Sequence, residues 1–164
     1  MIHMQKITPC LWYEGKAEEA ANFYTSIFKN SKIIETSRYD EASATVSGMP
    51  AGSVLTVSFE LNGQSFIALN GGPIFKLTEA VSFMIDCKDQ EEVDYYWSKL
   101  TEGGSESVCG WLKDKYGLSW QVVPSQLNKF LSDPDPVKAG RVMKEMLEMK
   151  KIIVADLEKA YGGK

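Results

Sequence analysis

The sequence is poor in histidine and cysteine, two residue types on which much catalytic and metal chemistry depends. It holds one histidine, His3, at its beginning, and three cysteines, Cys10, Cys87 and Cys109. Because terminal residues are often poorly ordered, we expect neither a Ser-His-Asp or Cys-His catalytic arrangement nor a site with two histidine ligands. The absence of a C-x-x-C pair argues against a thioredoxin-type redox site and a cysteine-rich zinc site. We expect three reduced thiols that act as small hydrophobic side chains.

Long hydrophobic runs and an excess of positive charge are also missing. No apolar run approaches the ~20 residues that span a bilayer, and no charged-then-apolar signal segment opens the chain. We therefore expect a cytoplasmic protein with no membrane partner. The 18 Lys and Arg residues against 22 Asp and Glu residues give a net charge of −4, which argues against a nucleic-acid partner. What is present, 44% hydrophobic and 24% charged residues, is typical of a folded domain.

The first half of the sequence predicts the order strand, helix and three strands. The short apolar stretch 7–13 predicts a strand, and apolar residues at helical spacing over 17–28 predict a helix. Residues 32–39 alternate loosely as a second strand, and residues 40–52, rich in Ala, Ser and Gly, predict a mobile loop. The clearest signal is Asn62-Gly63 between two apolar stretches, which predicts a hairpin because both residues tolerate positive φ.

The second half repeats this order and suggests a duplicated unit. It predicts a strand at 80–86, a helix that begins near Asp89, and further strands around 106–109, 111–115 and 119–123. Aligning Glu18-Glu19 with Glu91-Glu92, a shift of 73 (91 − 18), places Phe23-Tyr24 on Tyr96-Trp97 and Leu11 on Met84.

After Pro124 the pattern becomes helical. A capping Asp135 before Pro136 and apolar residues from Val142 to Ile153 predict one or two helices as far as Tyr161. We expect this Met-rich stripe to pack against its own domain or a second subunit. The predicted organisation is a domain over residues 1–130, with modules at about 5–72 and 78–125, and a C-terminal helical extension over 131–164.

Three segments resemble a known family. They are residues 7–24, residues 69–73 and, above all, residues 109–124, CGWLKDKYGLSWQVVP. They look like the PhnB-like family, often labelled 3-demethylubiquinone-9 3-methyltransferase, of the vicinal-oxygen-chelate superfamily that includes glyoxalases and bleomycin-resistance proteins. The resemblance runs from about residue 5 to the C-terminus. It implies an α+β fold of two tandem βαβββ modules, with curved mixed sheets around a cleft, in a homodimer.

The methyltransferase label disagrees with the sequence pattern. AdoMet-dependent enzymes of the usual kind hold the cofactor at a glycine-rich turn between a first strand and helix of a doubly wound sheet. Here the glycine pairs precede a proline or follow helices, and one helix per three strands does not supply the strand–helix alternation of that sheet. We expect no methyl transfer and no cofactor.

The resemblance also implies where a metal would bind. In metal-using members of the superfamily, the metal ligands are His, Glu or Gln residues on the first and fourth strand of each module. The matching positions here are Gln121, Ile67, a position near Pro9, and one near Ala80 or Ser82. Gln121 alone could coordinate, and one amide oxygen is a poor sole ligand for a transition metal. We therefore expect no metal site.

A cleft for a small molecule remains. If Gln121 points inward, strand alternation predicts that a largely apolar set of side chains with a few hydroxyl groups points inward as well. Such a lining is typical of a small-molecule pocket. Tyr13 is expected on this face, Trp120 beneath a helix, and Lys113-Asp114 in a solvent-exposed turn, with a general acid or base at the cleft mouth as the alternative. The predicted ligand-binding residues are Gln121, Ser119, Ser82, Met84, Leu11, Trp111 and Asn70.

Three functions stay open on the sequence. The first is binding of a small apolar or aromatic molecule in the cleft of a homodimer, without a catalytic metal. The second is a metal-dependent lyase, isomerase or oxygenase of the same superfamily. The third is an interaction protein that works through its C-terminal helix. The sequence leaves open whether any reaction is catalysed and whether residues 40–52 act as a lid.

Overall fold

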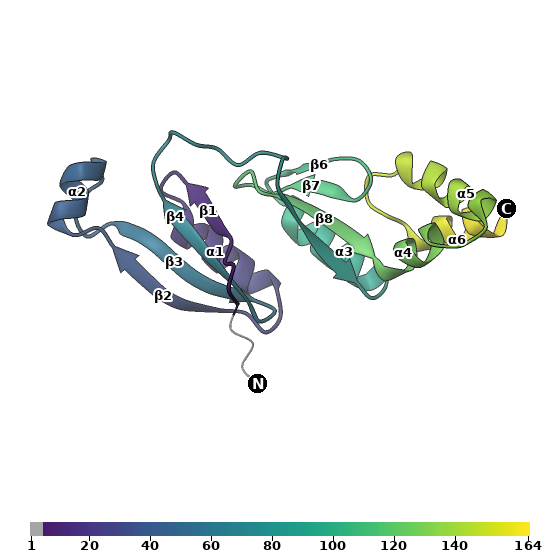
Figure 1. The fold of residues 1–164 in the computed structure, drawn as a ribbon, viewed down its shortest axis with the longest axis horizontal. Helices are drawn as coiled ribbons and strands as arrows, with labels where there is room; N and C mark the ends of the chain where they lie inside the picture. The colour runs from purple at the N-terminus through teal and green to yellow at the C-terminus, as the bar shows by residue number, and fades with distance from the viewer. Residues whose placement is uncertain (1–4) are drawn as a thin grey trace. The chain divides into compact units, whose positions relative to one another are not determined.

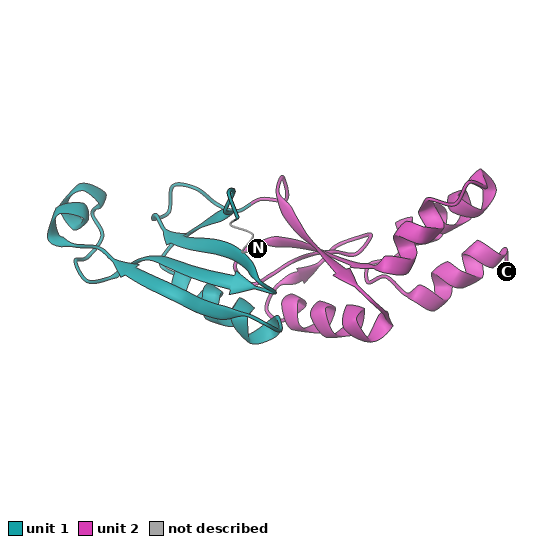
Figure 2. Ribbon diagram, turned by 60° about the horizontal axis from the view of Figure 1, so that its bottom comes forward, with its two compact units in different colours: residues 1–77 teal, residues 78–164 magenta. Residues whose placement is uncertain are grey.

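The computed structural model describes residues 5–164, so His3 lies outside the described residues. The chain divides into two compact units, residues 1–77 and residues 78–164 (Figure 2). Each unit has its own four-stranded mixed sheet, and together with the helices these sheets confirm the predicted α+β class. None of the helices within residues 5–164 is long and apolar enough to cross a membrane.

The first unit contains a sheet of strand order β1-β4-β3-β2, in which β1 is parallel to β4 and the other pairs are antiparallel (Figure 1). Its elements, in chain order, are β1 (Cys10–Tyr13), α1 (Ala17–Ile27), β2 (Lys32–Arg38), α2 (Glu41–Ser47), β3 (Val54–Leu61) and β4 (Gln64–Asn70).

One face of this sheet is buried under α1. The helix turns Ala20, Tyr24 and Ile27 inward, at the three- and four-residue spacing that the sequence predicts. The Tyr24 ring lies 6.2 Å from that of Phe59, which in turn lies 5.5 Å from that of Phe66. These aromatic contacts form the centre of the core of the first unit.

The predicted hairpin is confirmed at Asn62-Gly63. Both residues have positive φ, 49° and 78°, and the antiparallel pairing of β3 with β4 reaches Leu61 and Gln64 on either side of them. The two-residue turn is therefore the kind that Asn-Gly favours.

The sequence predicts a mobile loop over residues 40–52, and this is wrong for its first part, where the chain forms the helix α2. Asp40 caps this helix by accepting a hydrogen bond from the Ser43 backbone N–H, and the Ser43 hydroxyl accepts one from the Asp40 backbone N–H. Gly48 ends the helix in the left-handed conformation. Asp, Ser and Gly are turn-forming residues, but at this spacing they also cap a short helix.

The second unit contains a sheet of strand order β5-β8-β7-β6, with β5 parallel to β8 and the other pairs antiparallel. Its elements, in chain order, are β5 (Ser82–Cys87), α3 (Gln90–Thr101), β6 (Ser105–Glu106), β7 (Trp111–Lys113), β8 (Ser119–Pro124), α4 (Ser125–Leu131), α5 (Pro136–Leu147) and α6 (Val154–Gly162). Asp89 caps α3 by accepting a hydrogen bond from the Glu92 backbone N–H.

The predicted shift of 73 residues holds for the helices but not for the strands. Ala20, Tyr24 and Ile27 of α1 correspond to Val93, Trp97 and Leu100 of α3, and all six side chains are buried. Tyr13, buried at the end of β1, instead corresponds to Cys87, buried at the end of β5, which is a shift of 74. The connection from strand to helix is thus one residue shorter in the second unit. The alignment of Leu11 with Met84 is wrong, because Leu11 is buried and Met84 is exposed.

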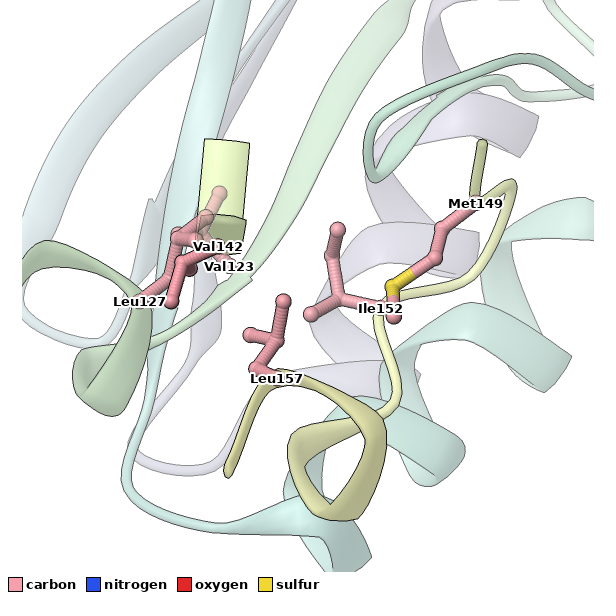
Figure 3. Close-up of a cluster of buried hydrophobic side chains, with 6 residues drawn as sticks. All are labelled: Val123, Leu127, Val142, Met149, Ile152 and Leu157. Carbon is pink, nitrogen blue, oxygen red and sulfur yellow. The ribbon is translucent and has the colours of Figure 1, made fainter. Parts of the chain in front are cut away.

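The C-terminal helices pack together and against the end of β8. Figure 3 shows six buried side chains that come from β8, from all three helices and from the segment between α5 and α6. They are Val123, Leu127, Val142, Met149, Ile152 and Leu157. The predicted Met-rich stripe therefore packs within its own unit. Met143 and Leu147 are its exposed members, and α4 is a helix that the sequence analysis did not predict.

We expect Ile152→Ala to lower the free energy of unfolding by about 2–5 kcal/mol, since Ile152 is fully buried and its removal leaves a cavity. The matched control is Leu147→Ala, which removes a similar volume from an exposed position and should change stability by less than about 0.5 kcal/mol. Urea unfolding of both variants measures the difference. Equal unfolding midpoints would contradict the packing described for the C-terminal helices.

Candidate functional site

The candidate site lies on the face of the second sheet opposite α3, which we call the open face. The register of β5, β8 and β7 places six of its side chains in two cross-strand rows, because paired residues point to the same side of a sheet. The outer row contains Ser82, Ser119 and Lys113, and the inner row contains Met84, Gln121 and Trp111. Residues on the other side of the sheet alternate with these and include Cys87, Leu112, Trp120 and Val122, all buried.

Gln121 stands at the centre of the inner row, and a hydrogen bond fixes its side chain. Its Nε2 atom donates to the Ser82 hydroxyl at 2.9 Å, which joins the two rows. Its Oε1 atom has no hydrogen-bond partner among residues 5–164, and the residue is partly exposed. Gln121 thus presents an oriented acceptor to whatever lies on the open face.

Ser119 lies next to Ser82 and Lys113 in the outer row and is 1% exposed. Within the described part of the chain, its hydroxyl oxygen makes no hydrogen bond. A buried hydroxyl without a partner is uncommon in folded proteins. Ser119 therefore offers an unused donor and acceptor beside Gln121.

Two apolar side chains flank Gln121 in the inner row. Met84 is 60% exposed, and Trp111 is partly exposed. Val123, two residues beyond Gln121 on the same strand face, is covered by the C-terminal cluster. The open face thus combines an apolar surface with a few oriented polar groups, the composition of a site for a small organic molecule.

Five of the seven residues predicted to bind a ligand come together here: Gln121, Ser119, Ser82, Met84 and Trp111. Their role in binding stays a prediction. The other two, Leu11 and Asn70, belong to the first unit.

The predicted orientation of Leu11 and Tyr13 is wrong. Leu11 pairs with Ala68, and Tyr13 pairs with Asn70, and all four residues are buried on the side of the first sheet that α1 covers. The opposite face of β4 carries Ile67 instead. The error arises because the extra residue between β1 and α1 shifts the alternation of this strand relative to β5.

Asn70 uses its side chain inside the fold. Its Oδ1 atom accepts a hydrogen bond from the Ala17 backbone N–H at 2.9 Å, and its Nδ2 atom donates to the Val54 carbonyl at 3.1 Å. Lys16, at the N-cap position, makes no capping hydrogen bond with its side chain. Asn70 therefore caps α1 from the neighbouring strand, and its predicted place in the ligand site is not supported by this geometry.

The prediction of a solvent-exposed turn at Lys113-Asp114 is wrong for Asp114, which is 3% exposed. Its Oδ1 atom accepts hydrogen bonds from the backbone N–H groups of Tyr116 and Leu118, and its Oδ2 atom accepts one from Trp120 Nε1. Asp114 thus holds the turn between β7 and β8. The pattern of Asp followed by Gly three residues later could have indicated this turn. Trp120 is buried beside Phe83 on the α3 side, as predicted.

We expect Asp114→Asn to lower the free energy of unfolding by about 1–3 kcal/mol, since every contact just described brings an N–H donor to the carboxylate. Whichever way the new amide points, its NH₂ group faces one of these donors. Urea unfolding measures the loss. The control is Asp156→Asn, which breaks an exposed ion pair with Lys159 and should have little effect. An unchanged midpoint for Asp114→Asn would contradict this role.

The donors on the open face do not fit a catalytic transition metal. Ser82 and Gln121 are neutral, and the one carboxylate on this face of the strands, Asp86, lies beside Val123 in the next row. Residues 5–164 contain no group of three His, Cys, Asp or Glu side chains placed to hold a metal ion. Divalent transition metals bind well to several imidazole, thiolate or carboxylate ligands and poorly to isolated amides and hydroxyls.

The thiols lie in different surroundings. Cys87 is buried under α3, and burial raises its pKa to about 12. Cys10 is exposed in β1. Because burial favours the neutral thiol of Cys87, its contribution to stability is present below the ordinary thiol pKa of 9.0 and falls as the pH rises toward 12.

We expect iodoacetamide near pH 8 to label Cys10 in the folded protein and to leave Cys87 unmodified, since with a pKa of about 12 only about one Cys87 thiol in ten thousand is ionised. Peptide mass spectrometry before and after unfolding in guanidinium chloride measures both sites. Cys87 should become labelled after unfolding. Labelling of both thiols at one rate in the folded state would refute the assignment.

Solved structures of similar proteins share the fold. A protein from Bacillus cereus, described as a putative 3-demethylubiquinone-9 3-methyltransferase, PhnB protein, is 41% identical, with a TM-score of 0.66 over 74% of this chain and 100% of its own. Protein PA1353 from Pseudomonas aeruginosa is 18% identical, with a TM-score of 0.59 over 74% of this chain and 98% of its own. The fosfomycin resistance protein FosX from Listeria monocytogenes, solved with Mn(II) and sulfate, is 16% identical, with a TM-score of 0.53 over 80% and 97%. At these low identities the last two show the fold alone.

A comparison with curated proteins found no match. Residues 5–123 match the family described as 3-demethylubiquinone-9 3-methyltransferase, so the helices after β8 lie beyond the matched region, which does not extend to the C-terminus as expected. This match covers most of the chain and agrees with the Bacillus cereus structure. The chain therefore belongs to the PhnB-like, 3-demethylubiquinone-9 3-methyltransferase family, and it shares its fold with FosX.

Proposed function

We propose that this protein binds a small, largely apolar or aromatic molecule against the open face, without a catalytic metal. The observation that carries the proposal is the fixed amide of Gln121, which Ser82 orients while its Oε1 atom stays available. Gln121 also occupies the position where the superfamily resemblance implies a ligand residue. The neutral donor set supports a binding function that does not depend on a metal.

The inner row supplies the apolar contact that such a ligand needs. Met84 and Trp111 stand on the strands on either side of Gln121, so each lies about 5 Å from it across the sheet. A planar ring laid over Gln121 reaches both side chains. Burying about 150 Å² of apolar surface there favours binding by about 4 kcal/mol before the cost of association.

The family's methyltransferase description is not part of this proposal. Each unit has a mixed sheet, and the β1–α1 connection, Glu14-Gly15-Lys16, holds a single glycine. A doubly wound parallel sheet with a glycine-rich first turn is the usual means of holding AdoMet, and neither unit offers it. The cytoplasmic compartment and the homodimer implied by the family resemblance remain further parts of the proposal, and size-exclusion chromatography with light scattering tests the dimer.

A thermal-shift screen with hydroxylated and carbonyl-bearing aromatic compounds tests the proposal. A ligand at 100 times its Kd should stabilise the protein by about 2.7 kcal/mol. Gln121→Leu and Trp111→Ala should each remove most of that shift, since they delete the oriented acceptor and one apolar wall. Val137→Ala changes an exposed side chain of α5 and should leave the shift unchanged.

Elemental analysis of the purified protein accompanies the screen. Less than stoichiometric metal together with a ligand shift that depends on Gln121 supports the proposal. Stoichiometric manganese, zinc or iron that is lost in Gln121→Leu, with catalysis of a lyase, isomerase or oxygenase reaction, contradicts it and favours the metal-dependent alternative. The absence of any shift across the panel also contradicts it.

A further inference from the structure

Lys113 is the one basic residue in the strands of the second sheet, and it stands in the outer row of the open face. Its ammonium group forms an ion pair with Glu79, in the irregular segment before β5. The hydrogen bond from Lys113 lowers the pKa of the Glu79 carboxyl, so Glu79 is ionised at neutral pH. A positively charged and a negatively charged side chain thus meet at the edge of the proposed ligand site.

The ion pair lies at the same end of the second sheet as the buried Ser119. Ser119 lies on the middle strand, between Lys113 on β7 and Ser82 on β5, with about 10 Å between the two outer positions. Glu79 is three residues before Ser82, so a contact between Lys113 and Glu79 spans from β7 to the chain entering β5. Ser119 itself is 1% exposed, and its hydroxyl has no partner in the described chain.

We propose that the molecule bound on the open face carries a carboxylate or similar anionic group, which displaces Glu79 and takes its place on Lys113. This inference rests on the proposed function and deepens it. The anion then lies within the outer row, where the hydroxyl of Ser119 can donate to it. In the unliganded protein, Glu79 occupies the position of the ligand's anion.

We expect the ligand to replace Glu79 rather than Lys113, and therefore to be an anion, because the two residues of the ion pair differ in how firmly the fold holds them. The Glu79 side chain is 62% exposed and belongs to a turn, whereas Lys113 is 38% exposed and belongs to a paired strand. Glu79 can therefore leave without disturbing the sheet. An ion pair this exposed to water is weak, so a ligand carboxylate competes with it effectively.

Isothermal titration calorimetry with 2-naphthoate and 2-naphthamide tests the inference, since the two compounds share a ring system and differ in charge. The wild-type protein should bind 2-naphthoate about fivefold more tightly, because a hydrogen bond to a charged group is stronger than one between neutral groups. Glu79→Gln should increase that ratio by removing the internal competitor. Lys113→Gln should bring the ratio close to one. Lys159→Gln, which breaks an exposed ion pair on α6, is the matched control and should leave the ratio unchanged.

The outcomes separate this inference from the proposed function. Equal binding of both compounds by the wild type, unaltered in Lys113→Gln and Glu79→Gln but lost in Gln121→Leu, overturns the anion site and leaves the open face as the binding site. Binding of neither compound, by the wild type or by Glu79→Gln, contradicts both proposals. A 2-naphthoate preference that Lys113→Gln abolishes supports the inference, as does a loss of that preference at high salt.

Discussion

The parallel pairing of β5 with β8 is the interaction on which the candidate site depends. It sets Ser82 beside Ser119 and Met84 beside Gln121, and the antiparallel pairing of β8 with β7 adds Lys113 and Trp111 to the same rows. A slip of β5 by one residue against β8 would turn Ser82 and Met84 toward α3 and leave the rows incomplete. The burial of Leu112, Trp120 and Val122 under α3 therefore fixes the composition of the open face.

The turn between β7 and β8 shows how the same register is maintained. Asp114 ties two backbone N–H groups of the turn to the indole of Trp120 on the buried face. Its neighbour Lys113 points to the open face and pairs with Glu79. The adjacent charged residues Lys113 and Asp114 thus lie on opposite sides of the sheet and make different interactions. The buried carboxylate is satisfied by the fold, and the exposed ammonium is held by an ion pair that water weakens.

The C-terminal extension contributes to the site from outside the region that matches the family. Its chain between α5 and α6 runs along the loop before Trp111, where the Cys109 and Gly110 N–H groups donate to the carbonyls of Met149 and Lys150. Its apolar cluster also covers Val123 at the end of β8. The extension therefore contacts both the end of β8 and the loop that leads into β7.

How much could be predicted depended on whether the signal was local. Turn chemistry identified the hairpin at Asn62-Gly63, and helical periodicity identified α1 and α3, because backbone preferences and amphipathic spacing act within a few residues. The motif after Cys109 indicated the family, and strand alternation correctly grouped Ser82, Ser119 and Gln121. These features were determined by the sequence by itself.

The tertiary structure decided what depends on contacts between distant segments. One residue of difference between strand and helix turned Leu11 toward α1, and Asn70 of β4 caps the buried N-terminus of that helix. Burial of Asp114 required Trp120, six residues away, to come within hydrogen-bonding distance. Local pattern cannot reveal these outcomes, since the face on which a side chain lies and the partner that satisfies it are set by packing between elements.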